Sequence, residues 1–276
     1  MRRALRAGRS RGLIELRQSV TNGGDLVNHF LWPVLMLATL WFLRDRSFGG
    51  FTLGPLLVPS ILGMNAAMAM VSMSQHLTAD REDGTLLRAR ATPHGVTGYL
   101  TGKLITISGG LILDLAIFLV PALLLIGGVG TSAAGWAALA GLLALGLLAT
   151  LPAGAVLGSV ITSARGQGLL TLPILAVIAI SGVFYPITAL PGWLQGVAQA
   201  FPVYWMGLGT RAAMLPPAAA AVEIGQSWRH LETIAVLSAW AVAGLLVAPI
   251  VLRRMARREA GSALASRKER AMQRTG

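Results

Sequence analysis

The side chains that could carry out chemistry are few and widely spaced along this chain. The sequence has no cysteine, which excludes disulfides, thiolate catalysis and cysteine-ligated metal sites. Its four histidines are His29, His76, His94 and His230. No two of them lie four residues apart, and no pair of carboxylates accompanies them, as a metal site would require. No serine lies in a nucleophile motif, so we expect neither a catalytic residue nor a metal ion.

One short segment resembles a nucleotide-binding loop. Residues 98–103 read GYLTGK, which is one residue too short for the phosphate-binding pattern G-x-x-x-x-G-K. Leu104 stands where that pattern requires serine or threonine. We therefore expect this chain to bind no nucleotide and to have no cofactor of its own.

Asp114 is the one acidic residue deep within a long apolar run. Acids inside membrane-spanning helices face the protein interior and are frequently functional. Lys103 lies on the same helical face but about 16 Å away, too far for a direct ion pair. Asp114 therefore has three possible roles: a structural hydrogen bond, a part in substrate binding or coupling, or chance placement near the outer interface.

The composition is that of a membrane protein. The chain is 54% hydrophobic and only 12% charged, with a mean hydropathy of +0.66. A soluble domain carries about twice that charged fraction. Several apolar runs reach the length of about 20 residues that a helix needs to cross a bilayer. We therefore predict an all-α integral membrane protein.

The apolar runs predict six transmembrane helices, at about 26–43, 53–74, 99–127, 136–161, 169–184 and 231–252. Residues 1–25 combine arginines with an apolar face, which predicts an amphipathic helix in the cytoplasmic interface. Residues 253–276 form a basic tail whose arginines suit anionic headgroups. Gly154 and Gly158 permit a close helix contact.

The positive charges orient these helices. All but four of the 23 basic residues lie in the N-terminal segment, the predicted inner loops and the tail. The four predicted to lie outside are Arg44, Arg46, Arg211 and Arg229. Because cytoplasmic segments are enriched in lysine and arginine, both termini are expected to be cytoplasmic. The same distribution explains the net charge of +12 without nucleic acid as a partner.

Residues 75–94 are the only long charged stretch between two apolar runs. Gly84 is expected to break the chain before a short helix that lies along the membrane surface. One interpretation is a docking element for another protein, and the other is a solvated loop held on the cytoplasmic side by its arginines. The residues assigned to docking are Asp80, Arg81, Glu82, Asp83, Gly84, Thr85, Leu86, Leu87, Arg88 and Arg90.

Residues 187–230 are less apolar and rich in proline and aromatic side chains. They predict short re-entrant helices in the outer leaflet, or alternatively an ordinary outer loop. Breaks are expected at Pro191, Pro202 and Pro216. The residues assigned to this exit segment are Phe184, Tyr185, Pro186, Trp193, Phe201, Tyr204 and Trp205.

Two motifs carry a family resemblance. Residues 80–86, DREDGTL, followed by Ala91-Thr92-Pro93, resemble the E-R-E-x-G-T-L…T-P signature of the ABC type 2 permeases. Residues 181–186, SGVFYP, and 190–194, LPGWL, are similar to that family's S-G-x-F-x-P…L-P-x-W-L segment. The motifs occur in the expected order, and Asp80 stands where the family commonly has glutamate.

The resemblance implies a function that the residues alone do not. Such permeases are membrane subunits of ATP-driven exporters, including the daunorubicin- and antibiotic-resistance type. The implied partners are an ABC ATPase subunit in two copies, which would hold ATP and Mg²⁺, a second or related permease, and membrane lipids. The implied substrate is hydrophobic or amphipathic, and the implied location is the bacterial plasma membrane.

Two other classes of protein remain possible from the residues. A membrane enzyme acting on a lipid-linked substrate would place carboxylates or a histidine near the interface, where Glu223, His230 and Glu232 are candidates. A secondary transporter would usually show an inverted repeat. No clear internal symmetry is visible in the sequence.

Overall fold

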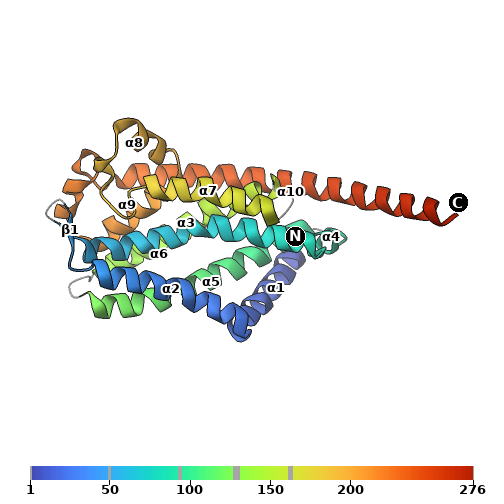
Figure 1. Ribbon diagram of the computed structural model, residues 1–276, viewed down its shortest axis with the longest axis horizontal. Coiled ribbons are helices and arrows are strands. Elements are labelled where there is room, and N and C mark those ends of the chain that lie inside the picture. The colour runs from blue at the N-terminus through green and yellow to red at the C-terminus, as the bar shows by residue number, and fades with distance from the viewer. Residues whose placement is uncertain (1, 49–50, 93–94, 127–130, 161–163, 276) are drawn as a thin grey trace.

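The protein is a bundle of long helices (Figure 1). The computed structural model describes residues 2–48, 51–92, 95–126, 131–160 and 164–275, with the side chains of the last helix up to Met255. The long helices are α1 (Arg2–Thr21), α2 (Gly23–Leu43), α3 (Leu53–Glu82), α5 (Gly95–Leu125), α6 (Ala133–Val160), α7 (Ala164–Ile180) and α10 (His230–Thr275).

Short elements lie at both ends of the bundle. At one end α4 (Thr85–Arg90) follows α3, close to the N-terminus (Figure 1). The opposite end has a two-residue antiparallel pair, β1 (Ser47–Phe48) with β2 (Phe51–Thr52), and a run of short helices. That run consists of η1 (Ile187–Ala189), α8 (Gly192–Gln199), α9 (Pro202–Met214), η2 (Pro217–Val222) and η3 (Ile224–Gln226).

Five helices within the described ranges are long and apolar enough to cross a membrane. They are Gly23–Leu43, Leu53–Glu82, Gly95–Leu125, Ala133–Val160 and His230–Met255. The predicted span 169–184 corresponds to α7, which ends at Ile180 and has only 17 residues. A multi-pass membrane protein is therefore supported, and the sixth crossing stays a prediction.

Several helices extend past their predicted boundaries. The first span was predicted to begin at 26, whereas α2 begins at Gly23, immediately after Asn22 caps it. The second was predicted to end near 74, whereas α3 continues to Glu82 through the charged stretch. The last was predicted to end at 252, whereas α10 continues to Thr275. In α3 the charged side chains do not stop the helix, because residues 75–82 contain neither glycine nor proline and the break comes only at Gly84.

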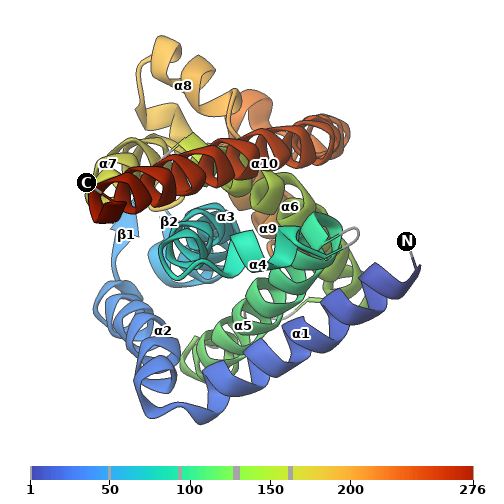
Figure 2. The same ribbon diagram turned by 90° about the vertical axis from the view of Figure 1, so that its right-hand side faces the viewer.

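Helix α3 forms the centre of the bundle and contacts α5, α6 and α9 (Figure 2). Glycine allows α6 to approach it closely. A Cβ added at Gly154 would lie 2.2 Å from the Met70 carbonyl oxygen, and one added at Gly158 would lie 2.9 Å from the Ser74 Cα. The predicted small-residue contact is therefore the α3–α6 interface.

A second glycine seam joins α1 to α5 (Figure 2). A Cβ at Gly8 would lie 2.4 Å from the Gly98 carbonyl oxygen, and one at Gly12 would lie 2.5 Å from that of Gly102. The glycines of the GYLTGK segment thus serve backbone packing. They position α1 alongside the first turns of α5.

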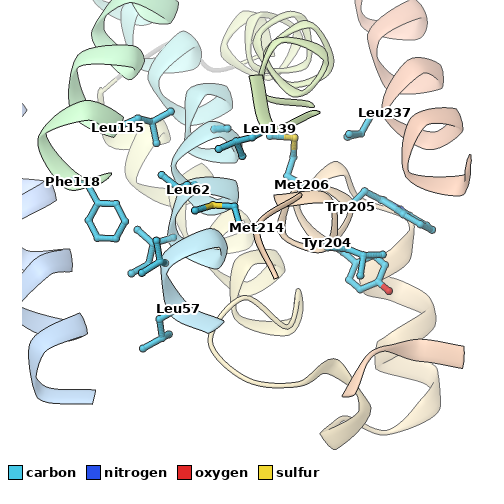
Figure 3. Close-up of a cluster of buried hydrophobic side chains, with 14 of the residues drawn as sticks. Leu57, Leu62, Leu115, Phe118, Leu139, Tyr204, Trp205, Met206, Met214 and Leu237 are labelled. Carbon is cyan, nitrogen blue, oxygen red and sulfur yellow. The ribbon is translucent and has the colours of Figure 1, made fainter. Parts of the chain in front are cut away.

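The main apolar core lies around α9, near the end opposite α4. Figure 3 shows Tyr204, Trp205 and Met206 of α9 with labelled side chains of α3, α5, α6 and α10. These neighbours include Leu62 of α3 and Leu237 of α10. The chain therefore folds α9 into the bundle, and does not leave it as a surface loop.

Candidate functional site

The turn between α3 and α4 has the local chemistry that the sequence predicts. Gly84 has φ of +73°, a left-handed conformation that glycine adopts without steric cost. Asp83 Oδ1 accepts a hydrogen bond from the Thr85 backbone N–H at 2.8 Å, which starts α4. Hydrogen bonding to Thr85, through its side chain first and its backbone N–H second, lowers the pKa of the Asp83 carboxyl below its ordinary value.

Leu86 is not on the outer surface of α4. Its side chain is fully buried in an apolar cluster that includes Leu77, Tyr99 and Leu252. The predicted direct contact between Leu86 and another protein is therefore incorrect in this fold, because the side chain packs inside the bundle and holds α4 against it. Leu87 is half-buried. Through such contacts α4 touches α3, α5 and α10 at once.

The exposed part of the predicted docking element is polar. Glu82, Asp83 and Arg88 are exposed, and Arg88 Nη2 donates locally, to Thr85 Oγ1 at 3.0 Å. Arg81 turns towards α6 and donates to the Gly158 carbonyl oxygen at 3.3 Å. The side chain of Arg90, together with Pro93 and His94, lies outside the described residues. The outward surface of α4 thus combines both signs of charge.

Asp80, also assigned to docking, is instead buried in an ion pair. Its Oδ2 lies 2.9 Å from Lys103 Nζ and accepts the Tyr99 hydroxyl at 2.7 Å. Lys103 Nζ also lies 3.0 Å from Glu15 Oε2, so one lysine bridges two carboxylates. Asp80 therefore belongs to an internal connection between α1, α3 and α5. We name this set of Glu15, Asp80, Tyr99 and Lys103 the inner charge network.

Glu15, a residue of α1, is bonded within α1 as well as to α5. Arg11 Nε donates to Glu15 Oε1 at 2.8 Å, and Thr106 Oγ1 donates to Glu15 Oε2 at 3.3 Å. Burial alone would raise the pKa of the Glu15 carboxyl, but hydrogen bonds from Arg11 and Lys103 outweigh it and leave that pKa below its ordinary value. Sequence reasoning missed this network. Two features of the sequence could have pointed to the network. Glu15 is an isolated acid among the arginines of α1, and Lys103 is an isolated lysine in an apolar run.

Asp114 has a partner that the sequence did not suggest. Its Oδ1 lies 2.5 Å from His29 Nδ1, so α5 is linked to α2. Asp114 lies about 7.5 Å along α5 from Gly109, which packs on Leu16 of the arginine-rich helix α1. The outer-interface placement considered for Asp114 stays a hypothesis.

The predicted exit segment divides into exposed and buried residues. Trp193 is 70% exposed and Phe184 is 36% exposed. In contrast, Tyr204 and Trp205 are buried in the core, where Trp205 Nε1 donates to the Gln199 carbonyl oxygen at 2.7 Å. Their predicted contact with headgroups or substrate is therefore incorrect for this arrangement. Phe201 is half-buried at the start of α9.

Two further residues of that segment are less exposed than Trp193. Pro186 is buried, and Tyr185 is half-buried with its hydroxyl donating to the Ala179 carbonyl oxygen. The expected breaks at Pro191, Pro202 and Pro216 each cap a short helix or begin one. Of the seven residues assigned to the exit segment, Trp193 and Phe184 are thus the ones exposed to the surroundings of the bundle.

A buried ion pair holds α9 in place. Arg211 Nε lies 2.7 Å from Glu223 Oε1, and both side chains are almost fully buried. Arg211 Nη1 also donates to Ser60 Oγ at 3.2 Å. Glu223 is thus engaged in structure, which weakens its candidacy as an enzymatic carboxylate. Within the described residues, no three His, Asp or Glu side chains are grouped to hold a metal ion.

Comparison with known proteins identifies the family. The family described as ABC-2 type transporter matches residues 10–215, which include the whole of α3, α4 and α5. No curated protein matches the chain. Since the family match covers most of the sequence and the helices suit a multi-pass membrane protein, the chain belongs to the ABC-2 type transporter family, the membrane components of ABC transporters.

Proposed function

We propose that this chain is the permease subunit of an ATP-driven exporter in the bacterial plasma membrane. It moves a hydrophobic or amphipathic molecule, such as a drug, antibiotic or lipid, out of the cell. A separate ABC ATPase binds ATP and Mg²⁺ and hydrolyses the nucleotide. Two ATPase subunits serve two permease copies, or one copy and a related permease.

The observation that carries the proposal is the placement of α4. This helix lies at the end of the bundle where α1 begins, the end beyond which α10 extends to the C-terminus (Figure 1). Its buried Leu86 fixes it to three long helices, while Glu82, Asp83 and Arg88 point outwards. A partner pushing on this charged surface would therefore move α3, α5 and α10 together. Such a contact is what an ATPase needs to convert its own closure into helix motion.

Residues at the same end of the molecule support a cytoplasmic location for that end. The arginines of α1 and the exposed Arg253 and Arg254 of α10 favour the cytoplasmic side. The exposed apolar residues Leu13 and Ile14 of α1 suit the lipid interface. The opposite end, with Phe184 and Trp193 exposed, would then face outwards and act as the exit.

The test is recovery of an ATPase with the permease. We expect the tagged full-length chain to co-purify with an ATPase subunit, and the pair to export a fluorescent amphiphile from liposomes only with ATP. Replacing Arg88 with Glu should lower ATPase retention several-fold, because an exposed interfacial charge changes sign. Membrane abundance should not change, since the Arg88 side chain is exposed and its Nη2 donates locally to Thr85.

A matched control separates docking from general charge effects. Arg46 is exposed at the opposite end of the bundle, next to β1, so Arg46→Glu should retain the ATPase fully. Full retention and export by Arg88→Glu combined with Glu82→Arg would remove α4 as the docking element. ATP-independent export by the chain alone would overturn the proposed function as a whole.

A further inference from the structure

A polar cavity lies between α2, α3 and α5, within the helices that qualify as membrane spans. Its volume is about 300 Å³. Five polar side chains among those that line it are His29 and Trp32 of α2, Asn65 and His76 of α3, and Asp114 of α5. Helices that contact only lipid and apolar neighbours have no need of such groups, which are costly to keep in a bilayer.

The carboxylate in this cavity is incompletely paired. Among the described residues that line the cavity, Asp114 is the only carboxylate, and none is lysine or arginine. Asp114 Oδ1 is bound to His29, but in the described part of the chain no hydrogen bond reaches Oδ2. The side chain of Asp114 remains 29% exposed, so a ligand can reach it. A carboxylate oxygen without a partner favours a ligand that brings both a hydrogen-bond donor and a positive charge.

The nearest basic side chain of α5 cannot supply that cation. Lys103 Nζ already forms ion pairs with Glu15 Oε2 and Asp80 Oδ2, each within 3.0 Å. Arg11 is likewise bound to Glu15. The second carboxylate oxygen of Asp114, Oδ2, is therefore available to a molecule from outside the chain.

The rest of the lining suits an amine attached to an apolar body. Trp32 Nε1 donates to Asn65 Oδ1 at 3.1 Å, which fixes the indole ring in the wall of the cavity that Asp114 also lines. Tryptophan rings attract ammonium groups. Met68, Ile107 and Leu111 supply apolar wall in the same cavity. A purely apolar ligand would leave Asp114 Oδ2 without a partner, and an anion would be repelled by the carboxylate.

We propose that this cavity binds amphipathic molecules through a protonated amine, with Asp114 as the counter-ion and the apolar part against Met68, Ile107 and Leu111. Binding does not depend on the proposed function. Only the step from bound amine to exported substrate rests on it. The site lies within a single chain, so one permease copy is sufficient to form it.

The test uses monodansylcadaverine, a fluorescent primary amine, and its N-acetylated form, which has the same apolar body but no positive charge. The purified full-length permease is held in nanodiscs of neutral phosphatidylcholine, which avoids attraction of the amine to anionic lipid. We expect the amine to bind about tenfold more tightly than its acetylated form, equivalent to one buried charge contact of about 1.4 kcal/mol. Asp114→Asn should abolish this preference, whereas Asp114→Glu should retain it.

The matched control is Asp25→Asn, which removes an exposed carboxylate from the same end of α2 and does not line the cavity. It should preserve the preference for the amine. An equal affinity of the native chain for both compounds would overturn the proposal. So would an unchanged preference in Asp114→Asn.

A second measurement avoids dependence on the stability of Asp114 variants. The chain has no cysteine, so Ser72→Cys places a single thiol in the cavity wall. The amine should slow its reaction with a maleimide, and the acetylated compound should not. Ser132→Cys, on the exposed start of α6, should react equally with and without either compound. Failure of amine protection at Ser72→Cys overturns the site, whereas intact protection without ATP-driven export would refute the proposed function alone.

Discussion

Lys103 offers the most quantitative test of how the bundle is held together. Its ammonium group lies 2.9 Å from Asp80 Oδ2 and 3.0 Å from Glu15 Oε2, and its side chain is only 5% exposed. Replacing Lys103 with Met keeps the length of the side chain and removes the cation. Two carboxylates then face each other with no charge between them.

The expected cost follows from what each carboxylate retains. Breaking a buried ion pair by removing one partner costs about 3–5 kcal/mol. Glu15 keeps its bond from Arg11, and Asp80 keeps its bond from Tyr99, so the lower end of that range applies. We therefore expect a loss of about 3 kcal/mol, or more than a hundredfold in the folding equilibrium.

Thermal unfolding of the purified protein in nanodiscs measures this loss. Lys103→Met should unfold at a clearly lower temperature than the native chain. The double variant Asp80→Asn with Lys103→Met should recover much of the difference, because the orphaned charge is removed while Tyr99 can still donate. Arg88→Met is the control, since that exposed side chain contributes less than about 0.5 kcal/mol.

Two results would refute the reasoning. If Lys103→Met unfolded at the native temperature, the network would carry no net energy. If the double variant were less stable than Lys103→Met by the full cost of Asp80→Asn alone, the two residues would not be coupled.

Three further predictions concern other contacts. Because the folded-state pKa of Glu15 is lowered, its stabilising contribution is present above the ordinary pKa of 4.5 and is lost as pH falls from there through the folded-state value. Glu15→Gln should therefore show a weaker loss of thermal stability on acidification. Gly12→Leu should separate α1 from α5, because its Cβ would meet the Gly102 carbonyl oxygen, and should therefore speed tryptic cleavage in α1. Gly23→Ala, which has open space around it, should leave the rate of cleavage unchanged. Arg211→Met should lower the free energy of unfolding by about 3–5 kcal/mol, measured by thermal unfolding, because it leaves the buried Glu223 carboxylate without its ion-pair partner. Adding Glu223→Gln should restore part of that loss.

The sequence predicted the helices well because their signal is local. Length and apolar composition alone located each of the five candidate spans. The positions of Gly84 and of the prolines likewise predicted the turn before α4 and the breaks around α8 and α9. Backbone restrictions on these residues act within a few positions, whatever the tertiary structure does.

Side-chain partners were less predictable because they come from distant parts of the chain. Leu86 and Leu87 look equivalent in sequence, yet only Leu86 is fully buried, since α4 turns that side towards Leu77 and Leu252. Trp205 looked like an interfacial aromatic, but α9 folds into the bundle and covers it. His29 and Asp114 are separated by 85 positions, and no local pattern connects them.

One face of α5 connects these separate observations. Tyr99, Lys103, Thr106 and Asp114 recur at spacings of three, four and eight residues, which places them on one side of the helix. The first two belong to the inner charge network, Thr106 both donates to Glu15 and lines the cavity, and Asp114 supplies the cavity's carboxylate. The beginning of the same helix is in contact with α4. A displacement of α4 would therefore reach the amine site through a single rigid element, and α5 is the helix whose movement would couple docking to ligand release.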